Sequence, residues 1–145
     1  MPIGFEKILS STPLSDIKAP PPFPVGTYLA ATEGLGEWGE SRQKKTKQIQ
    51  FKCKVLSPQS DVDQQKLMEW RDETGETVMG QEFYATFWDD VRLKGFLIAL
   101  GFSDSITGSE ALAQAAGRQF LVVFRHVPSQ DGKRIVHEVA EYKAV

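Results

Sequence analysis

The chain has 145 residues, of which 41% are hydrophobic and 25% charged, and its formal net charge is −2. This length and composition are typical of one globular domain with its own core, and no apolar run reaches the roughly 20 residues that a membrane-spanning helix needs. A single cysteine, Cys53, excludes an internal disulfide and favours a reducing compartment. We therefore expect a cytoplasmic protein without a secretory signal or a membrane partner.

Residues 1–24 are predicted to form an extended, proline-rich arm. They end in "KAPPPFP", in which four prolines within five positions impose a polyproline conformation and exclude a helix. We expect this arm to lead into a domain formed by residues 25–145 and to lie outside its core. The first strand of that domain is predicted in "VGTYLAAT", residues 25–32.

The next segment, "GLGEWG" at residues 34–39, matches the Gly-x-Gly-x-x-Gly pattern of dinucleotide-binding loops. Such a loop needs a helix that starts at the glycines, because the amide groups of the helix end bind the pyrophosphate. The next regular element here is a predicted strand. The pattern therefore indicates a flexible hairpin tip, and we expect neither a nucleotide cofactor nor a small-molecule substrate.

Residues 47–56, "KQIQFKCKVL", have the clearest pattern in the chain. Ile49, Phe51, Cys53 and Val55 alternate without a break with polar and basic residues. Alternation with a period of two predicts a strand whose apolar face lies in the core and whose basic face points outward.

The remaining elements follow in chain order. Polar residues 57–81 are predicted to be an excursion with a short helical turn at Gln64–Trp70, and "EFYATFW" at residues 82–88 is predicted to be the third strand. A helix capped by Asp89 or Asp90 follows, with an apolar face and a stop at Gly101. A short second helix is expected from Ser109 to Gly117, and two strands close the chain at residues 118–127 and 134–145. The apolar face of the first helix consists of Leu93, Phe96, Leu97 and Leu100.

This order predicts a mainly β fold: a five-stranded OB-fold-like barrel with a helix between strands three and four. A generic mixed sheet with one covering helix is the alternative.

Basic residues are concentrated in one stretch, because residues 42–54 carry six of them and no acidic residue. Proteins that bind single-stranded nucleic acid combine a positive groove with aromatic side chains on which bases stack. We therefore predict a nucleic-acid site, with a solvated charged hairpin as the alternative. The candidate residues are Trp38, Arg42, Lys44, Lys45 and Lys47 in the hairpin, Lys52 and Lys54 on the outward face of the second strand, and Tyr84 and Trp88 on the third.

Catalytic and metal-binding patterns are weak. His126 and His137 lie in predicted strands without a partner at metal-ligand spacing, and Cys53 is expected to act as a small hydrophobic residue. We expect no enzyme, no catalytic residue and no metal site. An enzyme that uses the glycine loop is the least favoured hypothesis.

Four segments together resemble phage-encoded small proteins of the DUF669 type: "PFPVGTYLA", "KTKQIQFKCKVL", "EFYATFWDDVRLKGFLIALGF" and "AAGRQFLVVFRHVPSQDGKRIVHEVAEY". The resemblance covers residues 22–143. It implies an OB-fold protein that binds single-stranded DNA during phage replication or recombination in the host cytoplasm. It also implies that Lys44, Lys45, Lys47, Lys52 and Lys54 form the groove.

Two features depart from that family. The excursion at residues 57–81 is long, and the final segment "HEVAEYKAV" lacks the acidic tail with which bacterial single-strand binders recruit partners. Self-association and replication or recombination proteins are further candidate partners. The alternative function is a non-catalytic protein-interaction module, in which the proline-rich arm docks on a partner or a neighbouring copy.

Overall fold

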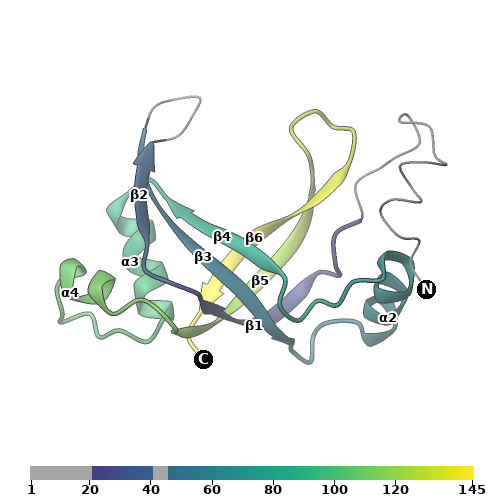
Figure 1. Cartoon of the computed structure of the whole chain (residues 1–145), viewed down its shortest axis with the longest axis horizontal. Coiled ribbons are helices and arrows are strands. Elements are labelled where there is room, and N and C mark those ends of the chain that lie inside the picture. Colours follow the sequence, from purple (N-terminus) through teal and green to yellow (C-terminus); the bar gives the residue numbers. More distant parts are fainter. Residues whose placement is uncertain (1–20, 41–45) are drawn as a thin grey trace.

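The structure is a computed structural model that describes residues 21–40 and 46–145. Six strands and three helices form these residues (Figure 1): β1 (Gly26–Thr32), β2 (Glu37–Glu40), β3 (Lys47–Pro58), α2 (Gln64–Thr74), β4 (Glu82–Phe87), α3 (Asp90–Ala99), α4 (Gly108–Ala113), β5 (Gln119–Pro128) and β6 (Ile135–Lys143). The fold is mainly β, as predicted. The prediction lacked β2, whose four residues are all exposed and show no alternation, so that only its pairing with β3 identifies it as a strand.

β3 lies at the centre of the sheet and pairs with three strands. β1 and β2 follow one another along one of its edges, and β4 occupies the other, so that Cys53 lies between Thr32 and Phe83. β5 pairs with β1, and β6 pairs with β5; every pairing is antiparallel. β4 and β6 therefore run in the same direction. No ladder joins them in the described residues, and the sheet is open between them instead of closing into the predicted barrel.

The core lies on the side of β3 that its alternation predicts. Ile49, Phe51, Cys53 and Val55 are each at most 2% exposed. Burial raises the pKa of the Cys53 thiol to about 12, so that the thiol stays protonated at neutral pH, consistent with its predicted hydrophobic role. Helix α3 covers this core with Phe96, whose ring centroid lies 5.0 Å from those of Phe51 and Phe87.

Helix α3 follows the prediction and helix α4 does not. Asp89 caps α3 by accepting a hydrogen bond from the amide of Arg92 at 2.8 Å, and Gly101 follows the helix with a positive φ of 96°. The expected Ser109 cap of α4 is wrong. Thr107 caps this helix instead, because its hydroxyl accepts from the amide of Glu110 at 3.2 Å, and the helix ends at Ala113 rather than near Gly117.

The predicted excursion contains a full helix, α2, which is longer than the helical turn expected at Gln64–Trp70. The Asp63 carboxylate caps its start, and Gly75, with φ of 71°, ends it. Its one buried side chain is Trp70, which attaches the helix to the rest of the domain. None of the described helices is long and apolar enough to cross a membrane.

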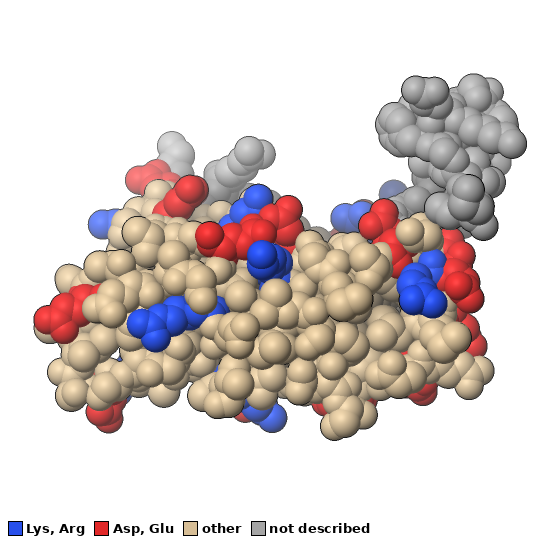
Figure 2. Space-filling view, turned by 60° about the horizontal axis from the view of Figure 1, so that its bottom comes forward, with Lys and Arg blue, Asp and Glu red and all other residues tan. Residues whose placement is uncertain are grey.

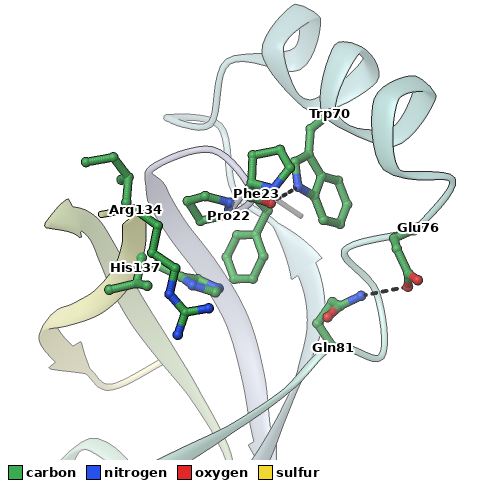
Figure 3. A pocket seen from close by; sticks show the side chains of 10 residues that line it. Pro22, Phe23, Trp70, Glu76, Gln81, Arg134 and His137 are labelled. Carbon is green, nitrogen blue, oxygen red and sulfur yellow. Dashed lines mark hydrogen bonds between the residues drawn. The ribbon is translucent and has the colours of Figure 1, made fainter. Parts of the chain in front are cut away.

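The last residues of the proline-rich segment pack against the domain, whereas the prediction placed them outside its core. Phe23 is only 3% exposed and lies between Trp70 of α2 and His137 of β6 (Figure 3). The Trp70 indole donates a hydrogen bond to the carbonyl of Pro21 at 2.8 Å, and His126 Nε2 lies 2.7 Å from the carbonyl oxygen of Phe23. The extended backbone favoured by these prolines places Phe23 in the core, and Pro24 is buried beside it in sequence. Residues 1–20 lie outside the described part of the chain.

Candidate nucleic-acid interface

The predicted site residues lie on two different faces of the sheet. Lys52 and Lys54 occupy the outward face of β3, as expected, and are exposed. Lys47 lies on the opposite face, because it is separated from the buried Ile49 by one residue and side chains alternate along a strand. Arg42, Lys44 and Lys45 lie outside the described residues. The basic stretch is therefore not a single stripe.

Trp38 and Lys47 are exposed side chains on the two strands of the β2–β3 hairpin. Trp38 is paired with Ile49 across the ladder but is 59% exposed, since the core does not extend this far. The Lys47 ammonium lies 5.2 Å from the centroid of the Trp38 ring, a cation–π contact that holds a positive charge beside an exposed indole.

The glycine pattern has a packing role at one position. A Cβ on Gly36 would lie 2.7–2.8 Å from side-chain atoms of Ile49 and Phe51, so that only glycine lets the backbone pass this close to the core. The pattern runs into β2, and the next element along the chain is β3 and not a helix, as predicted.

Two carboxylates hold Lys52. Its ammonium lies 2.9 Å from Glu82 Oε2 and 3.8 Å from Glu33 Oε2, and its hydrogen bond to Glu82 raises the pKa of the lysine. A hydrogen bond to Glu82 also raises the pKa of Glu33. Sequence reasoning missed both carboxylates. Only the strand register brings Glu82 within reach of Lys52, since Glu82 begins β4 opposite Lys54, two residues along the strand from Lys52.

Tyr84 and Trp88 are on the surface, at 58% and 51% exposure, as required of side chains that stack on bases. Tyr84 lies directly opposite Lys52 in the β3–β4 ladder. Between the two aromatic residues, Gln50 of β3 donates a hydrogen bond to the Thr86 hydroxyl at 3.1 Å. This face therefore presents aromatic, amide and cationic groups in adjacent positions.

A groove of about 1020 Å³ lies between β4 and β6, where the sheet is open. Tyr84 and Trp88 line one side of it. Arg92 of α3 and Arg125 of β5 line it as well, and sequence reasoning selected neither. Only the fold could have identified these arginines, because α3 and β5 are far from the basic stretch in sequence.

Two smaller hollows differ in character. One, of about 330 Å³, is lined by the packed Pro21–Phe23 segment and by Trp70 (Figure 3). The other, of about 370 Å³, lies between α3 and α4 and is mostly apolar. Among the described residues, no group of three or more His, Cys, Asp or Glu side chains is placed to hold a metal ion.

The charged side chains do not gather into one field on the face shown in Figure 2. Lys and Arg are interspersed there with Asp and Glu and are separated by wide uncharged areas. The candidate interface is therefore defined by basic residues next to aromatic rings, and not by a continuous region of positive charge. A scan against protein-family models and a search of curated proteins found no match for this chain.

Proposed function

We propose that this protein binds single-stranded DNA with little sequence preference, by phosphate neutralisation and base stacking. The observation that carries the proposal is that two exposed aromatic side chains each have a basic neighbour, and that a third shares a groove with an arginine. Lys47 lies over Trp38, Lys52 is the cross-strand neighbour of Tyr84, and Arg92 lines the same groove as Trp88. Stacking on such rings contributes about 1–3 kcal/mol per base, and the cations offset the phosphate charge.

The connectivity supports an OB-type architecture as part of this proposal. β3 and β4 correspond to OB strands two and three, and α3 lies between β4 and β5 along the chain. In Figure 1 the β2–β3 and β5–β6 hairpins extend on the same side of the sheet. OB-folds are partly open barrels that bind oligonucleotides with the face of strands two and three and with the loops of two such hairpins. The resemblance to phage proteins of the DUF669 type adds a role in phage DNA replication or recombination.

The test is a fluorescence titration with oligo-dT at several salt concentrations. We expect quenching of tryptophan emission, weaker binding to duplex DNA, and a linear fall of log K with log salt concentration. Replacing Lys44, Lys45 and Lys47 together by Glu should abolish binding, whereas Lys66→Glu on α2 should leave the affinity unchanged. An oligo-rU arm measures the preference between DNA and RNA. Absence of quenching at low salt would contradict the proposal.

A second candidate function is a protein-interaction module. Val91 on α3 is 74% exposed and Ile98 is 39% exposed, and both line the apolar hollow between α3 and α4. If this is the function, Val91→Lys should disrupt assembly, measured by sedimentation, while the triple lysine variant assembles normally. The DNA-binding proposal predicts the reverse sensitivities.

A further inference from the structure

The open side of the sheet presents two free strand edges. Within residues 21–40 and 46–145, β4 pairs with β3 only and β6 pairs with β5 only. The two strands run in the same direction on either side of the groove. Backbone amides and carbonyls at such edges have no ladder partner in the described residues and need water or a ligand instead.

Aromatic rings close the groove from below. The ring centroids of Phe83 and Phe124 lie 5.2 Å apart, and those of Phe87 and Tyr142 lie 5.8 Å apart, so that residues from the two sides of the opening touch beneath it. The floor of the groove is therefore aromatic, and the exposed rings of Tyr84 and Trp88 line the same groove. Aromatic surface beside cationic side chains suits the bases and phosphates of a single strand.

Two arginines line the groove, and each has an ion pair with one carboxylate. The Arg92 side chain is 76% exposed, and its one ion pair in the described residues is a loose contact of 3.7 Å with Asp89. Arg125 binds Glu138 through Nε at 2.9 Å and through a terminal nitrogen at 2.8 Å. Guanidinium groups bind phosphate in a bidentate manner and stack on bases, which lysine does not do.

We propose that the groove between β4 and β6 is a second part of the binding site, which takes the continuation of a bound single strand of nucleic acid. Its bases lie on Tyr84 and Trp88 at the rim, and its phosphates contact Arg92 and Arg125. Glu138 competes with the phosphate for Arg125 and so limits the affinity. This inference rests on the proposed function and adds residues that the β2–β3 hairpin and the outward face of β3 do not include.

The test compares variants in which one charged side chain is replaced by glutamine. Their affinity for labelled oligo-dT is measured by fluorescence anisotropy. Arg92→Gln and Arg125→Gln should each weaken binding about three- to ten-fold at low salt and make the salt slope shallower by about 0.7, the loss of one phosphate contact on a single strand. Glu138→Gln should strengthen binding, because it releases Arg125. If the Arg125–Glu138 ion pair served only to stabilise the fold, Arg125→Gln and Glu138→Gln would instead change the affinity for oligo-dT in the same direction.

Lys94→Gln is the matched control for Arg92→Gln. Lys94 is an exposed cation on the same helix, but it lines the hollow between α3 and α4 and not the groove. We expect its affinity and salt slope to equal those of the wild type. Urea unfolding of every variant verifies that the fold is retained.

Photocrosslinking with 5-iodo-deoxyuridine in the oligonucleotide gives an independent readout. We expect crosslinks to peptides that contain β4 or β6 and their flanking residues, at Tyr84, Trp88, His137 or Tyr142. The groove assignment is wrong if the arginine variants bind as well as the wild type and the crosslinks are confined to residues 37–54. The proposed function still stands in that case, provided that the wild type binds the oligonucleotide and the triple lysine variant does not. If the wild type binds no oligonucleotide, the proposed function itself fails.

Discussion

The Lys47 ammonium lies over the exposed ring of Trp38, 5.2 Å from its centroid, on the face of the sheet opposite to Lys52. A single strand that uses both groups must therefore pass around the edge of the sheet. Because Trp38 is 59% exposed, its contribution to binding is separable from any contribution to stability.

We expect Trp38→Ala to weaken oligo-dT binding by about 5- to 150-fold, the equivalent of one stacked base at about 1–3 kcal/mol. Trp38→Phe should retain part of the affinity, since it keeps an aromatic face. Thermal unfolding should be nearly unchanged in both variants, because the side chain is on the surface. An affinity equal to that of the wild type in Trp38→Ala would remove this residue from the site.

Glu82→Gln should strengthen binding several-fold. The Glu82 carboxylate lies 2.9 Å from Lys52 Nζ and competes with phosphate for this ammonium. Lys52→Gln is the matched variant and should weaken binding, with a shallower salt slope. Isothermal titration at two salt concentrations measures both effects, and a loss of affinity in Glu82→Gln would show that the carboxylate supports the site instead of competing for it.

Thr32→Val should lower the free energy of unfolding by about 1–3 kcal/mol. Thr32 is 2% exposed; its hydroxyl donates to the carbonyl of Ala115 at 2.5 Å and accepts from the amide of Arg118 at 2.9 Å. Valine fills the same space but leaves both partners without this bond. Urea denaturation measures the change, and the exposed Thr77→Val, which should stay within about 0.5 kcal/mol of the wild type, is the control.

Stability should fall between pH 7 and pH 5 because of His137. Desolvation against neighbouring rings, and then the charge of His126, lower the pKa of His137. In the unfolded chain this imidazole therefore takes up a proton near pH 6.5, whereas in the folded chain it becomes protonated only at a lower pH. Acidification through this range therefore favours the unfolded state. His137→Phe should be less sensitive to pH in urea denaturation. An equal dependence on pH in both proteins would contradict this account.

The elements that local patterns determine were predictable from the sequence. The unbroken alternation of β3 and the apolar face of α3 each identify a structure and its buried side, and burial of Ile49 and Phe96 confirms them. β2 was not predictable, because Glu37–Glu40 has no apolar alternation and depends on its ladder with β3. The α4 cap was missed because Thr107 and Ser109 carry the same chemistry two residues apart.

The geometry of the candidate site was predictable only in part. Aromatic and basic residue types selected Trp38, Lys47, Tyr84 and Trp88 as candidates, and all four side chains are exposed. The pairing of Lys52 with Glu33 and Glu82 depends on strand register, which a list of residues does not contain. The groove depends on the missing ladder between β4 and β6 in the described part of the chain, and that gap is a property of the sheet as a whole.

Because Phe23 is buried, the smallest fragment that can fold must begin upstream of Val25, where the domain was predicted to start. A protein begun at Val25 would lack this ring and leave a void bordered by Tyr28, Trp70 and Phe124. Loss of a buried phenyl group costs about 3–5 kcal/mol, a large share of the stability of a small domain. The Trp70 indole would also lose the acceptor that Pro21 supplies. Recombinant and proteolytic fragments that keep the fold should therefore begin before Pro21.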